Sequence, residues 1–251
     1  TPKMHLDRGE LVLVAEKKLQ RYKDRVEQLP AERRSETEKF FLEAHEFIQA
    51  QIAFFKTNYI ETLCNGNVRS QFDDRKTKLV SSIIHNDLTF GNIRFLPDKA
   101  RCFDLGFAQK DWRITEFNNL VLGTKGLSPI AFNDQLFRTA VEAYQNAMRI
   151  KLSEFELAGI LEIVRSRFIE QLTNRFLRQE IRLNDTLETI RDELAEFKIF
   201  AERYSVHSNI ASFINDHMIA TDQPDRHPIM KDEERYDRFL AAEKVSDMYA
   251  H

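Results

Sequence analysis

The chain of 251 residues is 42% hydrophobic and 31% charged, with a formal net charge of -3. This length allows one large domain or two small ones, and the slightly acidic balance gives no overall basic surface for nucleic acid. No stretch of about 18 apolar residues is present, so we expect no membrane span. The only cysteines are Cys64 and Cys102, which suggests buried thiols in a reducing, cytoplasmic compartment.

Two long helices are predicted in the first part of the chain. In residues 10–29 apolar side chains recur every three or four positions and therefore share one face. A short strand over residues 11–14 is the alternative, but the helical spacing continues past Lys17 and Lys18, which favours the helix. The second helix is predicted over residues 35–62, and its apolar stripe consists of Phe41, Ala44, Ile48, Ile52, Phe55 and Tyr59.

A β-hairpin is predicted in the middle of the chain. An Asn-Gly turn near residue 65 and a polar run lead to the apolar segment 79–84. The patterns of residues 93–95 and 100–103 then predict two short strands, joined by a turn at residues 96–99.

The chain after the hairpin is predicted to be helical. Ser153 and Glu156 form a capping-box pair at the start of one helix, and Asp185 and Glu188 repeat this signature before another. A final helix is expected over residues 231–249. The apolar stripes of this part are Phe137, Val141, Tyr144 and Met148, then Leu157, Ile160, Val164, Phe168 and Leu172, and then Leu187, Ile190, Leu194 and Phe197.

The most informative stretch is His85-Asn86-Asp87-Leu88-Thr89-Phe90-Gly91-Asn92, which is followed by Asp104-Leu105-Gly106. Phosphoryl transfer needs an acceptor hydroxyl aligned with the γ-phosphorus and positive charge near the phosphate oxygens. Asp87 can orient the hydroxyl or accept its proton. The amide oxygen of Asn92 and the carboxylate of Asp104 are hard ligands that suit Mg²⁺. We expect Gly106 to let the backbone bend sharply after Asp104.

His85 is expected to support this loop through a hydrogen bond from its ring to backbone near Asp104, with proton transfer as the alternative. Each part of the motif also has a plainer interpretation, because Asn-Asp before a hairpin is common turn chemistry and an Asp after a strand can cap a helix. The combination favours a kinase-type site: His, Asp and Asn stand at fixed offsets, a hairpin follows, and Asp-x-Gly ends it.

Three other groups of side chains could bind a ligand, although each has a simpler interpretation. Trp112 and Tyr204 could line a pocket for a quaternary ammonium group. A group of acids that could attract a cation, but is expected to be an exposed face, comprises Asp192, Glu193 and Glu196. A group of arginines that could bind an anion, but is expected to be a solvated face paired with Glu162, Glu170 and Glu180, comprises Arg165, Arg167, Arg175, Arg178 and Arg182.

At the motif residues the sequence resembles the aminoglycoside phosphotransferase and choline kinase family of kinase-like enzymes. His85-Asn86-Asp87-Leu88 is similar to the family's catalytic loop, and Phe103-Asp104-Leu105-Gly106-Phe107-Ala108 is similar to its metal-binding segment. The resemblance spans residues 79–177. It implies a mainly α (α+β) protein-kinase-like helical lobe in which a short β-hairpin carries both loops. It also implies Asp87 as the catalytic base, Asn92 and Asp104 as Mg²⁺ ligands, and His85 as support for the loop.

The sequence departs from the family in two places. The Asp that opens a helix and braces the catalytic loop appears here as Glu116, a longer acid that we expect to reach the loop amides less well. A nucleotide-binding lobe is not evident, because neither a Gly-rich loop nor a clear strand Lys paired with a helix Glu is present; Lys17 or Lys18 with Glu36 is conceivable. Residues upstream of Thr1, another chain or an unusual N-terminal segment, or loss of catalysis could each explain this.

The predicted function is transfer of the γ-phosphate of ATP or GTP to a hydroxyl group of a small molecule, with Mg²⁺ and without a nucleic-acid partner. The alternative is a kinase-derived binding or regulatory module that is catalytically inactive. We divide the chain into a helical segment that packs on the catalytic lobe (1–78), the core of that lobe (79–220), and a loop with a C-terminal helix (221–251).

Overall fold

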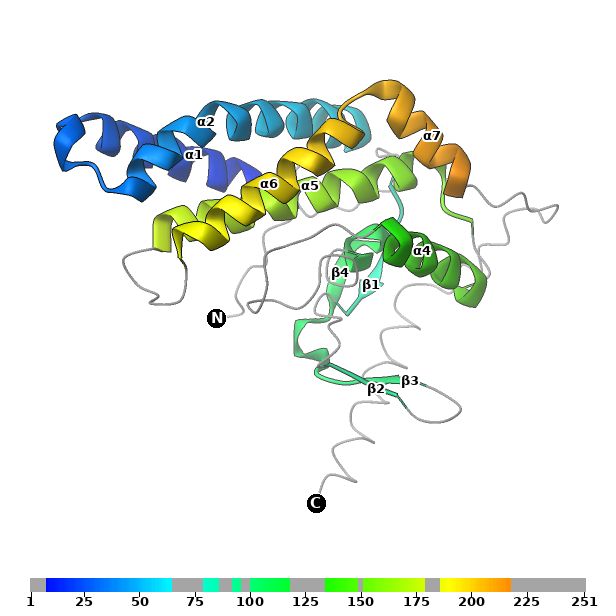
Figure 1. Cartoon of the computed structure of the whole chain (residues 1–251). Helices are drawn as coiled ribbons and strands as arrows, with labels where there is room; N and C mark the ends of the chain where they lie inside the picture. Colours follow the sequence, from blue (N-terminus) through cyan, green and yellow to red (C-terminus); the bar gives the residue numbers. More distant parts are fainter. Residues whose placement is uncertain are drawn as a thin grey trace, which may run out of the picture.

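The computed structural model describes residues 8–64, 79–85, 92–95, 100–117, 134–148, 151–178 and 186–217. These residues form a mainly α protein with two small antiparallel sheets (Figure 1). The predicted class, mainly helical with a short hairpin, is confirmed at this level. Not one of the described helices is both long enough and apolar enough to cross a membrane.

The first two predicted helices are present. The first is α1 (Arg8–Glu27), and it includes residues 11–14, so the helical interpretation of that segment is confirmed. The second is α2 (Glu36–Phe55), which continues as the π-helix η2 (Lys56–Leu63). All six residues of its predicted stripe are at most 2% exposed, because they face the neighbouring helices.

Side-chain caps fix where three helices begin. The hydroxyl of Ser35 accepts the amide N–H of Glu38 at 3.2 Å at the start of α2. Ser153 and Glu156 form the predicted capping box, since the Glu156 amide donates to Ser153 at 3.2 Å and the Ser153 amide to Glu156 at 3.1 Å. The third cap is Thr186 rather than the predicted Asp185, because the Thr186 hydroxyl can accept an amide of the first turn in the same way.

The centre of the helical layer is α5 (Glu154–Arg178). It contacts α1, α2, α6 (Leu187–Tyr204) and α7 (His207–His217), and Figure 1 shows α5 and α6 running beside each other below α2. The stripe predicted for α5 is at most 1% exposed throughout. Aromatic rings fill the space between helices: Phe168 stacks on Phe197 with ring centroids 4.9 Å apart. Burying one such ring stabilises the fold by about 1.5–3 kcal/mol.

Buried ion pairs cross this layer. Arg165 is 0% exposed and donates to Glu162 at 3.0 Å and to the backbone oxygen of Tyr204 at 3.0 Å. Arg175 donates to Glu193 at 2.6 Å, and both side chains are buried. The predictions of a solvated arginine face and an exposed acidic face are therefore wrong for these residues. Each charge lies opposite a partner, which is the condition under which protein interiors tolerate charged groups.

Two small sheets lie on one side of the helical layer (Figure 1). The predicted hairpin is confirmed as β2 (Ile93–Phe95) paired with β3 (Ala100–Cys102). The other sheet pairs β1 (Ser81–Ile84) with β4 (Gln109–Trp112) in antiparallel register. In Figure 1 the sheet of β1 and β4 is beside α4 (Asp134–Met148), and the hairpin of β2 and β3 lies further from the helices. The prediction of helix directly after Asp104 is wrong at β4, because this short polar strand is defined by a partner far away in the sequence.

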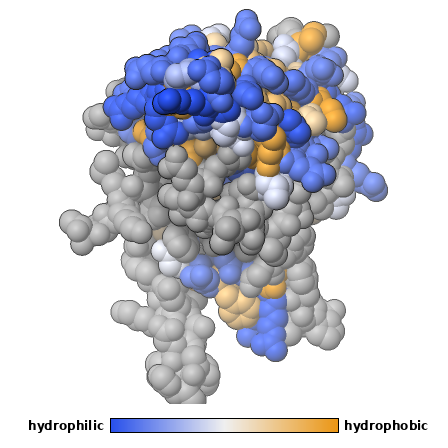
Figure 2. All heavy atoms as spheres, turned by 60° about the vertical axis from the view of Figure 1, so that its left-hand side comes forward, coloured by the Kyte–Doolittle hydropathy of each residue, from blue (hydrophilic) through white to orange (hydrophobic). Residues whose placement is uncertain are grey.

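The surface of the helical layer is mostly hydrophilic, with apolar side chains in small separate patches (Figure 2). Four large apolar side chains are exposed in the described residues: Val14, Phe103, Ile199 and Val206. Phe103 differs from the others, because it lies in the motif region, whereas Val14 and Ile199 lie on helices and Val206 lies between α6 and α7.

Several predicted features lie outside the described residues. They are the hairpin turn at 96–99, Glu180, Arg182, the loop at 221–228 and the helix at 231–249. The proposed domain boundaries at 78 and 220 fall there too and stay predictions. The helices on both sides of the first boundary share one core, since residues such as Leu19, Phe41 and Phe168 belong to the same cluster.

Candidate functional site

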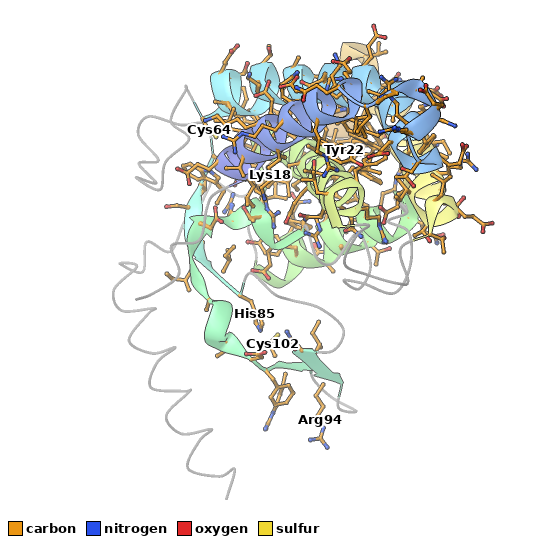
Figure 3. The ribbon with its side chains drawn as sticks, turned by 90° about the vertical axis from the view of Figure 1, so that its left-hand side faces the viewer. Lys18, Tyr22, Cys64, His85, Arg94 and Cys102 are labelled. Carbon is orange, nitrogen blue, oxygen red and sulfur yellow. The ribbon has the colours of Figure 1, made fainter. Side chains whose placement is uncertain are left out.

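The strands bring the two motif segments to one place. β1 ends at Ile84, immediately before His85, while the β2–β3 hairpin connects Asn92 to Phe103. A single 3-10 turn, η4 (Leu105–Phe107), then leads into β4, the partner of β1. Both ends of the hairpin therefore lie close to the end of β1. Figure 3 shows His85 between the helical layer and the hairpin, near Cys102.

Two hydrogen bonds join the segments at Phe103. The Nε2 atom of His85 lies 2.6 Å from the backbone oxygen of Phe103, and the amide of Phe103 donates to the backbone oxygen of Asn92 at 2.9 Å. A carbonyl oxygen only accepts, so Nε2 of His85 is the donor in this hydrogen bond. The predicted contact between His85 and backbone next to Asp104 is confirmed, and it favours the supporting role over proton transfer.

Asp104 has a left-handed backbone, with φ 57° and ψ 61°. It is the one non-glycine residue with positive φ in the described ranges, and such conformations gather at functional sites. The prediction that Gly106 makes the bend is wrong. Gly106 lies within η4, and a Cβ there would meet Asp104 Oδ1 at 3.4 Å, an ordinary contact. The chain turns at Asp104 itself because a short Asp side chain tolerates this conformation better than most.

Glu116 braces the start of the motif loop. Its Oε2 atom accepts the backbone N–H of His85 at 2.8 Å, so the expectation that the longer acid reaches the loop less well is wrong. Glu116 ends the 3-10 helix η5 (Arg113–Glu116), in which Ile114 and Thr115 are buried. Since η5 is fixed in the core, the longer side chain spans the remaining distance to the loop.

A buried ion pair anchors η5 to the helical layer. Arg113 donates to Glu156 from Nη2 at 2.6 Å, and Glu156 is 1% exposed. Glu156 is also the capping-box residue of α5. A continuous path of contacts thus runs from the start of α5 through Glu156, Arg113 and η5 to Glu116 and His85. Sequence reasoning missed Arg113, whose only signal is its place between the apolar residues Trp112 and Ile114.

One of the two cysteines does not match the prediction that both thiols are buried. Cys64 is buried, but Cys102 is exposed. Partial burial raises the pKa of the Cys102 thiol, and the negative charge of Glu116 raises it further.

The structure brings three of the four predicted site residues together: His85, Asn92 and Asp104. The fourth, Asp87, lies outside the described residues, two positions after His85. Within the described ranges, no group of three or more His, Cys, Asp or Glu side chains is placed to hold a metal ion. Asn92 offers an amide oxygen and Asp104 a carboxylate. Both are hard oxygen ligands of the kind that Mg²⁺ binds together with water and phosphate.

The predicted aromatic pocket residues are part of the core. Trp112 is 2% exposed and Tyr204 is 6% exposed, and the Tyr204 ring packs edge-on against Phe213 at 5.6 Å. Burial raises the pKa of Tyr204. Their burial favours a packing role over cation recognition.

No protein-family model matches this chain, and no curated protein matches it. The resemblance to kinase-like enzymes therefore depends on the motif residues and on the geometry around them.

Proposed function

We propose that this protein is a phosphotransferase that moves the γ-phosphate of ATP or GTP to a hydroxyl group of a small molecule. The observation that carries the proposal is the pair of hydrogen bonds at His85. One joins its ring to the backbone next to Asp104, and the other joins its amide to Glu116. Together they fix the segment that leads to Asp87 relative to the left-handed Asp104.

In this proposal the residues have distinct roles. Asp87 accepts or orients the proton of the acceptor hydroxyl. Asn92 and Asp104 hold Mg²⁺, which supplies positive charge near the phosphate oxygens. His85 and Glu116 touch neither substrate nor metal and act by positioning the loop. Fixed geometry of this kind is a major source of rate enhancement in phosphoryl transfer.

The acceptor class comes from the resemblance to the aminoglycoside phosphotransferase and choline kinase family, so amino alcohols and aminoglycosides are the first candidates. One observation supports the alternative, a binding module without turnover. Residues 8–63, which precede the motif, are helical and belong to the same core as α5. Within the described part of the chain, no β-rich nucleotide lobe stands before β1.

Transfer of radiolabelled γ-phosphate from ATP and from GTP, with Mg²⁺ and a panel of choline, ethanolamine and aminoglycosides, tests the proposal. Asp87→Ala should abolish transfer while Mg²⁺–nucleotide binding persists. Glu116→Ala removes the acceptor of the His85 amide and should lower kcat by about tenfold to a hundredfold, because loop positioning is lost, with little change in KM. The matched control is Glu142→Ala, which changes an exposed glutamate on α4.

The outcomes separate the two functions. Transfer that survives Asp87→Ala rejects the assignment of the base. Mg²⁺-dependent nucleotide binding by the wild-type protein counts against the binding module. Absence of such binding rejects the phosphotransferase and favours the binding module.

A further inference from the structure

Two arginines face each other on the β2–β3 hairpin. Arg94 and Arg101 are direct partners in the strand register, and both are exposed. Opposite residues in an antiparallel pair project from the same face with Cβ atoms about 4.5–5.5 Å apart, and like charges placed in this way destabilise the pair. In the described part of the chain, neither guanidinium has a hydrogen bond or an ion pair.

The arginines project from one face of the hairpin. Successive side chains of a strand point to opposite faces, so Arg94 and Arg101 share one face while the next register pair, Ile93 and Cys102, lies on the other. Figure 3 shows Arg94 extending from the hairpin away from His85 and from the helical layer.

This face continues to the metal-binding end of the hairpin. The hydrogen bond between Phe103 and Asn92 extends the register by one pair, which places both residues on the same face as the arginines. Among the described residues, the face thus has two positive charges without an ion-pair partner, next to the 42% exposed ring of Phe103.

Charged residues on a two-stranded ribbon can also serve to prevent pairing with other strands. That role needs charge somewhere on the ribbon, and it does not require two cations directly opposite each other. A guanidinium offers several donors in a plane that fits the oxygens of a phosphate group. A shared phosphate turns the repulsion between Arg94 and Arg101 into a bridged contact.

We propose that the Arg94–Arg101 face binds the phosphate groups of a small phosphate-bearing ligand. The ligand could be a nucleotide or another small phosphate compound, since both present the same oxygens. The inference depends on the hairpin alone and holds whether or not the protein transfers phosphate.

Titration calorimetry of the whole chain with tripolyphosphate, without metal, tests this site. Arg94→Gln and Arg101→Gln should each weaken binding by about tenfold, because each removes charged hydrogen bonds. Arg21→Gln changes an exposed arginine on α1 and should leave binding unchanged. The ligand-free Arg94→Gln protein should unfold at the same temperature as the wild type or at a higher one, since a repulsion is removed.

Competition identifies the source of the phosphate. ATP that displaces tripolyphosphate indicates a nucleotide, whereas displacement by glucose 6-phosphate but not by ATP indicates another phosphate compound; both support the site. Unchanged tripolyphosphate binding in both hairpin variants overturns it, as does binding of a DNA oligomer with no binding of any small phosphate. Asp87→Ala removes the proposed base but leaves both arginines in place. Loss of phosphotransfer and loss of tripolyphosphate binding can therefore be measured independently.

Discussion

The helical layer and the strand region of this protein are held together by different kinds of contact. Around α5, aromatic rings pack closely, and the buried pair Arg175–Glu193 joins α5 to α6. Around Asp104, single hydrogen bonds to backbone join exposed segments. Regions with few buried apolar contacts open locally at low free-energy cost. We infer that the helices supply the stability, and that the site loops depend on the helices for their position.

The two regions meet at α5. Glu156 caps this helix and pairs with Arg113 of η5, while Gly159 packs against Ile114 of η5 and Leu79 before β1. We call this contact between α5 and η5 the joint. Substitutions in the helical layer and at the joint test whether the helices supply the stability and whether the site loop depends on them for its position.

The largest effect is expected from Arg165→Met in the helical layer. The substitution leaves the Glu162 carboxylate buried without its partner, which should lower the free energy of unfolding by about 3–5 kcal/mol. Burial already raises the pKa of Glu162, against the opposing effect of Arg165. Urea denaturation measures the loss.

Arg138→Met is the matched control for that prediction. Arg138 pairs with Asp216 at 3.3 Å, and both side chains are about half exposed, so its loss should cost about 0–1 kcal/mol. Equal losses in the two variants would show that the buried pair is no more important than a surface pair.

A smaller effect is expected from Gly159→Ala at the joint. The added Cβ would lie 2.6 Å from Ile114 Cδ1 and 3.2 Å from Leu79 Cδ2, and overpacking of this kind typically costs about 1–3 kcal/mol. The buried Ile114 side chain must move, and we expect η5 to move with it, so the amide of His85 should exchange hydrogen faster than in the wild type. Hydrogen exchange and urea denaturation measure the two effects.

The double variant Gly159→Ala with Ile114→Val is the control for the joint. Valine lacks Cδ1, so it removes the closest contact and should restore slow exchange at His85. If Gly159→Ala alone leaves this amide unchanged, the position of the site loop does not depend on α5.

The smallest effect is a pH dependence in the helical layer. Burial, helped by the charge of Lys23, lowers the pKa of His45 below its ordinary value. The unfolded chain then binds more protons in mild acid, so stability is fully present above the ordinary pKa near 6.5 and falls as the pH drops towards the lower folded value. Between pH 7.5 and 5.5 the wild type should lose more stability than His45→Gln, by less than about 1.4 kcal/mol per pH unit.

Urea denaturation at several pH values measures the two slopes. The other histidines titrate equally in both proteins, so the difference isolates His45. Identical slopes would contradict a lowered pKa at this residue.

The sequence by itself determined the helices, the hairpin and the motif. Leu157, Ile160 and Val164 repeat at helical spacing, and the Ser153–Glu156 box depends on residues three apart, so both follow from local chemistry. The hairpin follows in the same way from two short strands and one turn.

Only the tertiary structure decided which charges are buried and what holds the site. Arg165 and Glu193 are residue types common on surfaces, yet both are buried because other helices supply partners: the backbone oxygen of Tyr204 on α6 accepts from Arg165, and Arg175 on α5 neutralises Glu193. β4 exists because β1 pairs with it. The hydrogen bond from His85 to Glu116 joins residues 31 positions apart. Contacts of this kind depend on how distant segments pack, and no local pattern of residues encodes that.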